Sequence, residues 1–122
     1  MRKIILAATA IMLVLTATVS FAGTENNLEI RKFKSDFNNS QEDFYDAAKA
    51  GFLKYFRRYS PEMVSKDDKK LVMAAKYGKH DILCIFYQDE NSRYFVAIDT
   101  KFNRDRVKWI ENVVKQVEAR AN

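Results

Sequence analysis

The clearest pattern of apolar and polar positions lies between residues 81 and 100. Two runs of β-branched and aromatic residues flank the polar stretch Asp89–Ser92. Runs of this kind around a short turn-forming stretch predict an antiparallel β-hairpin. With a four-residue loop at 89–92, Tyr87 would pair with Tyr94.

That pairing places apolar residues on both faces of the hairpin. One face would carry Leu83, Ile85, Tyr87, Tyr94, Val96 and Ile98, and the other Ile82, Cys84, Phe86, Phe95 and Ala97. An antiparallel pair with one wet face alternates apolar with polar residues instead. The pattern therefore predicts that helices or a partner cover both faces. If both helices share one face, we expect the other face to bind, with Tyr87 and Tyr94 at its turn end.

A first amphipathic helix is predicted over residues 41–59. Ser40 is a suitable N-cap, and Asp43 three residues later approaches a capping box. The helix would end before Pro61, because the residue preceding a proline avoids the α region. Its apolar half-wheel would consist of Phe44, Ala47, Ala48, Gly51, Phe52, Tyr55, Phe56 and Tyr59.

A second amphipathic helix is predicted over residues 103–120, with Asn103 as its N-cap. Arg104 and Arg106 in its first turn oppose the helix dipole. Its apolar stripe would consist of Val107, Ile110, Val113, Val114, Val117 and Ala121.

The segment Lys69–Tyr77 is compatible with two structures. Ala74 and a following Gly78 would suit a short helix with a glycine C-cap. The strand interpretation is favoured, because it gathers on one face Leu71, Met73, Ala75 and Tyr77. Residues 28–37 mix both periods and are interpreted as a lead-in segment, and residues 61–68 as a connection.

Together these elements predict a small α+β domain. Its elements would be an N-terminal helix, a three-stranded antiparallel meander and a C-terminal helix, after a cleaved signal peptide. The chain would divide into a signal peptide (1–22), a lead-in segment (23–40) and the α+β domain (41–122). The 122 residues less a 22-residue signal suit a single hydrophobic core.

The first residues have the pattern of a bacterial secretory signal. Arg2 and Lys3 form a positive region, and residues 4–19 carry no charge. Ser20-Phe21-Ala22 then places small residues three and one before a cut at Gly23. We therefore expect an exported protein, either periplasmic or secreted. The alternative, a retained membrane anchor, fits less well because spanning takes about 20 apolar residues.

Charge and cysteine content narrow the expectations further. Cleavage would lower the formal net charge from +5 to +3, because Arg2 and Lys3 leave with the signal. A balance this mildly basic does not predict nucleic-acid binding. The single cysteine, Cys84, cannot close an internal disulfide, and its place in the hairpin predicts a core residue.

Catalytic chemistry has little support in the sequence. His80 and Cys84 on one strand would stand about 13 Å apart, whereas a nucleophile and its base need about 3 Å. No ligand spacing predicts a metal, and no glycine-rich loop predicts a bound cofactor. We expect no catalytic residue. The alternative, a small carboxylate-dependent hydrolase, would require a pocket with two acids, Asp81 or Asp99 among them.

The expected function is therefore a non-enzymatic binding or interaction module, such as an inhibitor, an immunity-type protein or an envelope adaptor. Its partner would be another protein, and the chain a monomer or homodimer. The candidate binding residues, chosen as aromatic or basic, are Tyr87, Tyr94, Tyr55, Tyr59, Arg57 and Arg58. The alternative partner is an anionic envelope lipid or glycan. Clustering of Lys69, Lys70, Arg104 and Arg106 on one face would favour that alternative.

Overall fold

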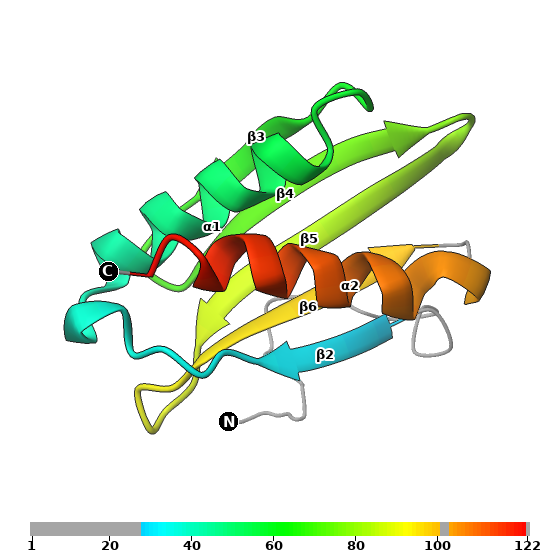
Figure 1. Cartoon of the computed structure of the whole chain (residues 1–122). Coiled ribbons are helices and arrows are strands. Elements are labelled where there is room, and N and C mark those ends of the chain that lie inside the picture. The colour runs from blue at the N-terminus through cyan, green and yellow to red at the C-terminus, as the bar shows by residue number, and fades with distance from the viewer. Residues whose placement is uncertain (1–27, 101–102, 122) are drawn as a thin grey trace.

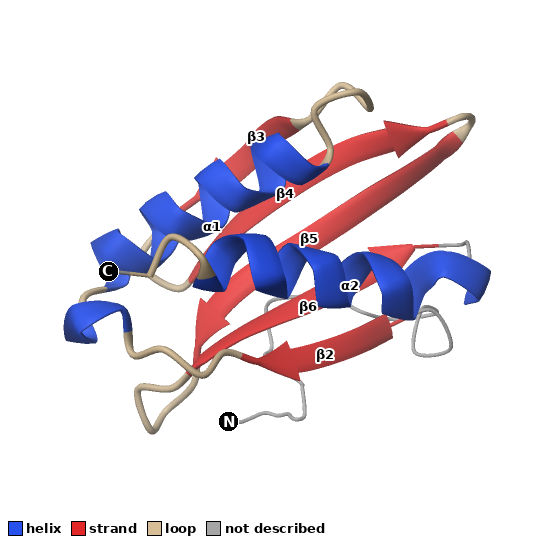
Figure 2. Ribbon diagram, in the orientation of Figure 1, coloured by secondary structure: helices blue, strands red, loops and turns tan. Residues whose placement is uncertain are grey.

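The computed structural model describes residues 28–100 and 103–121, which form one α+β domain. Five antiparallel strands make a single sheet, and two helices pack on one of its faces (Figure 1, Figure 2). The elements are β2 (Leu28–Lys32), the 3-10 turn η2 (Phe37–Asn39), α1 (Gln41–Tyr55), β3 (Glu62–Lys66), β4 (Lys70–Tyr77), β5 (His80–Gln88), β6 (Tyr94–Thr100) and α2 (Asn103–Glu118). The predicted signal peptide, residues 1–22, lies outside the described residues.

The sheet is larger than the predicted three-stranded meander. Its strand order is β2-β6-β5-β4-β3, so the meander has four strands and β2 joins its far edge. Lys69–Tyr77 contains a strand, as favoured, but the predicted connection at 61–68 contains β3, and the lead-in contains β2. Both missed strands lie at sheet edges, and every residue of β3 is exposed. An exposed strand has no buried face to impose an alternation of apolar and polar residues.

The hairpin register differs from the predicted one. Tyr87 pairs with Phe95, and Gln88 pairs with Tyr94, so the loop has one residue more than expected. The Asp89 side chain accepts hydrogen bonds from two loop N–H groups, those of Asn91 (3.0 Å) and Arg93 (2.8 Å). Ser92 is in the left-handed region at φ 63°.

A shift of one residue reverses the faces of a strand. The predicted faces of β6 are therefore wrong. Tyr94, Val96 and Ile98 point to the helices with β5 residues of even number, and Phe95 and Ala97 point away with Leu83, Ile85 and Tyr87.

The core lies between the sheet and the two helices. Cys84 is fully buried there, as predicted, and burial raises the pKa of its thiol. Ser40 caps α1 by accepting the Asp43 N–H at 3.1 Å, also as predicted. The helix ends at Tyr55, before the predicted Tyr59, whose carbonyl instead accepts the Lys76 N–H at 2.7 Å and joins the end of β4.

The two helices are close at one end and separate toward the other (Figure 1). A Cβ atom on Gly51 would stand 2.8 Å from Cγ2 of Val117, so only glycine permits this approach. From this contact, the helices diverge toward the C-terminus of α1 and the N-terminus of α2. Large aromatic rings occupy the space between them. Trp109, outside the predicted stripe, is buried there, whereas Val107 is 41% exposed.

Candidate binding surface

Five aromatic side chains fill the space where the helices separate. We call this group the aromatic end; its members are Tyr55, Phe56, Tyr59, Tyr77 and Trp109. Ring centroids lie 4.8 Å apart for Tyr55–Phe56, 6.3 Å for Phe56–Tyr59, 5.6 Å for Tyr59–Tyr77 and 5.3 Å for Tyr77–Trp109. The rings come from the end of α1 and the turn after it, the end of β4, and the first half of α2. One continuous aromatic cluster therefore links three elements.

The aromatic end has a buried base and an open rim. Phe56 and Trp109 are buried and touch each other edge to face, with centroids 6.3 Å apart. Tyr59 is 39% exposed and Tyr77 36%. Because the rim rings pack on a buried base, their side chains are held in place within the fold.

The backbone fixes the two rim tyrosines. Tyr59 is anchored by the hydrogen bond from Lys76 N–H to its carbonyl. Tyr77 pairs with His80 across a two-residue turn, and Gly78 in that turn has φ +64°, a conformation that glycine adopts without strain. The tight turn ends the strand at Tyr77, beside the turn that carries Tyr59.

Exposed basic residues flank the aromatic end in the sequence. They are Lys54, Arg57, Arg58, Lys79 and Lys108. Across residues 28–100 and 103–121, none of the five forms an ion pair with an acid. By contrast, Lys76 is paired with Asp81 at 2.9 Å and Arg106 with Glu29 at 3.6 Å.

The Tyr55 phenol of this surface is neutral at neutral pH. Burial raises the pKa of the Tyr55 phenol, and a hydrogen bond with the Asn112 side chain opposes that shift only in part. The charge of Asp105 also raises this pKa, so the aromatic end carries this acid beside its lysine and arginine side chains.

The structure brings together only some of the predicted binding residues. Tyr55 and Tyr59 belong to the aromatic end, with Arg57 and Arg58 between them in the chain. Tyr77 and Trp109 were missed. The alternation of β4 already placed Tyr77 on a face with core residues, and Trp109 directly precedes Ile110 of the predicted stripe.

Tyr87 and Tyr94 do not form the predicted pair. Tyr94 is 2% exposed and packs in the core against Phe37 (5.3 Å) and Phe44 (4.5 Å). Tyr87 lies on the opposite face of the sheet, stacked on Phe95 at 5.5 Å with the ring planes 14° apart. Burial, followed by the charge of Asp89, raises the pKa of the Tyr87 phenol. The longer hairpin loop separates the two residues.

The second candidate surface is the face of the sheet opposite α1 and α2, which we call the helix-free face. No helix within the described ranges packs on it, so the two helices share the other face and this is the face on which the sequence predicted binding. Its coverage by a partner stays a prediction. Its centre consists of side chains that are already buried, namely Ile85, Val72 and Ala97. Ile30 at its edge is 37% exposed. The aromatic end offers more accessible aromatic surface.

The basic residues singled out for an anionic partner do not gather on one face. Arg106 pairs with Glu29 of β2, at one edge of the sheet. Lys69 and Lys70 lie at the β3–β4 turn, toward the other edge, where the Asp67 carboxylate accepts both of their N–H groups. The five unpaired bases at the aromatic end are a different set.

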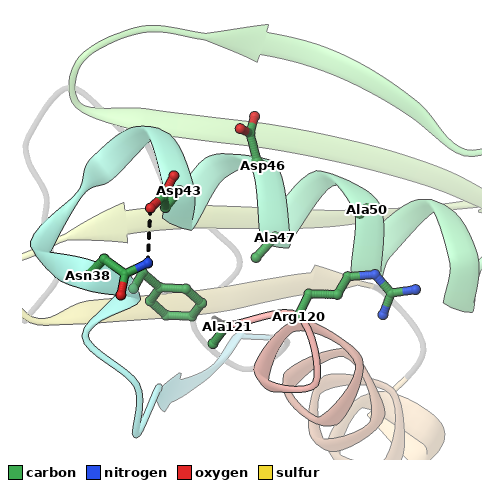
Figure 3. A pocket seen from close by; sticks show the side chains of 8 residues that line it. Asn38, Asp43, Asp46, Ala47, Ala50, Arg120 and Ala121 are labelled. Carbon is green, nitrogen blue, oxygen red and sulfur yellow. Dashed lines mark hydrogen bonds between the residues drawn. The ribbon is translucent and has the colours of Figure 1, made fainter.

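A cavity of about 530 Å³ opens between the start of α1 and the end of the chain (Figure 3). Its two carboxylates, Asp43 and Asp46, are exposed on α1, and Asp43 accepts a hydrogen bond from Asn38 at 3.2 Å. Arg120 donates to the Gln116 carbonyl at 2.9 Å. The residues lining the cavity are Phe37, Asn38, Asp43, Asp46, Ala47, Ala50, Arg120 and Ala121.

The hydrolase alternative requires a pocket with two acids that include Asp81 or Asp99, and both acids of this cavity are exposed ones from α1. The lining contains neither Asp81 nor Asp99. In the described part of the chain, no group of three or more histidine, cysteine, aspartate or glutamate side chains could hold a metal ion. Within the same ranges, neither helix has the length and apolar content needed to cross a bilayer.

Comparisons with models of known protein families, with curated proteins and with solved structures found no match to this chain. A proposal for its function therefore rests on the geometry of the molecule.

Proposed function

We propose that this chain is a small exported, non-enzymatic interaction module, and that the aromatic end is its contact surface. The observation that carries the proposal is the pair Tyr59 and Tyr77. Their rings touch, each is more than a third exposed, and both rest on the buried base. Rings that are already ordered lose little conformational entropy when a partner covers them.

The residue types at this end support the same proposal. Tyrosine, tryptophan and arginine carry much of the binding energy at protein contact surfaces. Here the Trp109 ring contacts Tyr77, and Arg57 and Arg58 directly precede Tyr59 in the chain. Export is supported by the secretory pattern of residues 1–22.

The contact surface can be tested by envelope retention. Purified exported protein is mixed with the envelope fraction of the native cells, and its co-sedimentation is measured. We expect Tyr59→Ser combined with Tyr77→Ser to reduce retention at least tenfold, since it removes both rim rings. Tyr87→Ser, on the helix-free face, serves as the matched control and should retain wild-type binding. Equal retention of all three proteins, or retention lost only with Tyr87→Ser, would refute the aromatic end as the contact surface.

Export has its own measurement. Mass spectrometry of the exported protein should give a chain that begins near Gly23. An intact chain beginning at Met1 would contradict cleavage of the signal.

A further inference from the structure

We propose that the partner of the aromatic end is a bilayer surface rich in anionic phospholipid. This inference rests on the proposed function, because it names the partner of the same surface. It starts from the chemistry of the rim. Tyrosine and tryptophan rings, apolar with one polar group, are enriched where a bilayer meets water. Tyr59 and Tyr77 present such rings at one end of the domain.

The charges of this end favour an anionic surface. Each lysine or arginine near an anionic leaflet strengthens binding about fivefold. The aromatic end offers five exposed bases on three segments: Lys54, Arg57 and Arg58 at the end of α1, Lys79 in the β4–β5 turn, and Lys108 on α2. Because they are distributed over separate segments, they suit several headgroups at once better than one small anion.

The opposite end of the domain lacks this excess of free positive charge. There Asp67 and Asp68 stand beside Lys69 and Lys70, and Arg93 lies 3.7 Å from Asp89. The first turn of α1, also at that end, carries Glu42 and Asp43. An anionic bilayer should therefore attract the domain by the aromatic end.

The start of α2 supports the inference independently. Positive charge near a helix N-terminus opposes the helix dipole and weakens the fold. Arg104 and Arg106 lie in the first turn of α2 together with Asp105, and Glu29 compensates Arg106. Arg104 in the first turn and Lys108 in the second are exposed and form no ion pair with a described acid, so both add surface charge, Arg104 at the expense of the helix.

Co-sedimentation with lipid vesicles provides the measurement. Exported, purified protein is mixed with vesicles of phosphatidylglycerol and phosphatidylethanolamine at a 3:7 ratio, and with vesicles of phosphatidylcholine alone. We expect the protein to sediment only with the anionic vesicles, and the binding to weaken between 0.05 and 0.5 M salt, as exposed charges are screened.

Two double variants test which basic residues contribute to bilayer binding. Arg57→Gln with Arg58→Gln should weaken anionic-vesicle binding about 30-fold, since two charges of about fivefold each are removed. Lys69→Gln with Lys70→Gln makes the same charge change at the opposite end and should alter binding less than twofold. Circular dichroism checks that both variants are folded.

Three outcomes would overturn the lipid inference: no binding by the wild-type chain, equal binding to the two vesicle types, or equal weakening by the two double variants. If envelope retention still depends on Tyr59 and Tyr77 in those cases, the contact surface stands and its partner is an envelope protein or glycan. If retention does not depend on them either, both proposals fail.

Discussion

Two aromatic clusters lie at opposite ends of the same domain, and their surroundings differ. We call the first the closed cluster; it consists of Phe33, Phe37, Phe44, Phe86 and Tyr94. Each of its members is at most 2% exposed. The aromatic end is made of similar residues and has equally close ring contacts, but its rim tyrosines are more than a third exposed.

The difference comes from the backbone that covers each cluster. At the closed end, η2 brings Phe37 over Phe33 and Phe44, with centroids 5.6 Å and 4.9 Å apart. All three η2 residues have positive φ, which is costly for a residue with a side chain. The Phe37 N–H donates to Ser35 Oγ at 3.1 Å, and the Asn38 N–H donates to the Asp36 carboxylate at 3.0 Å. These bonds and the burial of Phe37 offset the strain.

At the aromatic end, no described segment makes such a fold-back, and the helices separate instead. Burial of apolar surface is what stabilises a fold. The closed cluster should therefore support folding, whereas the rim of the aromatic end is free to contribute to binding. The following predictions test this division, from the largest expected effect to the smallest.

Phe44→Ala should cause the largest loss of stability. Phe44 is fully buried and touches the rings of the four other members of the closed cluster, including Tyr94 at 4.5 Å. Truncating a buried phenylalanine costs about 3–5 kcal/mol in the free energy of unfolding. Urea denaturation measures the loss. A cost below about 1 kcal/mol would mean that the closed cluster is not the core of this fold.

Gly51→Ala should cost about 1–3 kcal/mol, the usual range for overpacking. The added methyl group would stand 2.8 Å from Val117 Cγ2 and 3.0 Å from the Val117 nitrogen, so the helices must move apart. Ala50→Ser, at the exposed neighbouring position of α1, is the control and should change stability by less than about 0.5 kcal/mol. Equal effects of the two substitutions would contradict the close approach of the helices.

Cys84 should make stability depend on pH above neutrality. Burial raises its pKa in the folded state, and the unfolded thiol titrates near 8.5. The unfolded state therefore releases the proton first. The contribution of the buried, protonated thiol to the free energy of unfolding is fully present below about pH 8 and is lost as pH rises above about 8.5.

The limiting slope is about 1.4 kcal/mol per pH unit. Unfolding of wild type and Cys84→Ala, compared from pH 7 to 10, isolates this contribution. The same slope in both proteins would contradict the assignment. A thiol reagent should likewise label Cys84 only after denaturation, because the folded side chain is inaccessible.

Tyr59→Ser should have the smallest effect on stability, below about 1 kcal/mol, since the ring is 39% exposed. Urea denaturation beside Phe44→Ala makes the comparison between the clusters direct. A loss as large as that of Phe44→Ala would mean that the rim of the aromatic end is part of the core, and would remove the basis for its binding role.

Local patterns in the sequence were sufficient for most of the individual elements. Ser40 and Asp43 predicted the start of α1, because a capping side chain acts on N–H groups within its own turn. Alternation predicted a strand at Lys69–Tyr77, and burial in the hairpin predicted the core position of Cys84. These features depend on residues close together in the chain.

Only the tertiary structure decided how the elements meet. Both faces of the hairpin are apolar, so its pattern suits either register. The choice was made by the longer loop around Asp89 and Ser92, which separated Tyr87 from Tyr94. The edge strands β2 and β3 are defined by their neighbours in the sheet. The aromatic end combines segments more than 50 residues apart, from Tyr55 to Trp109. No local pattern predicts these contacts, because they depend on where the helices separate.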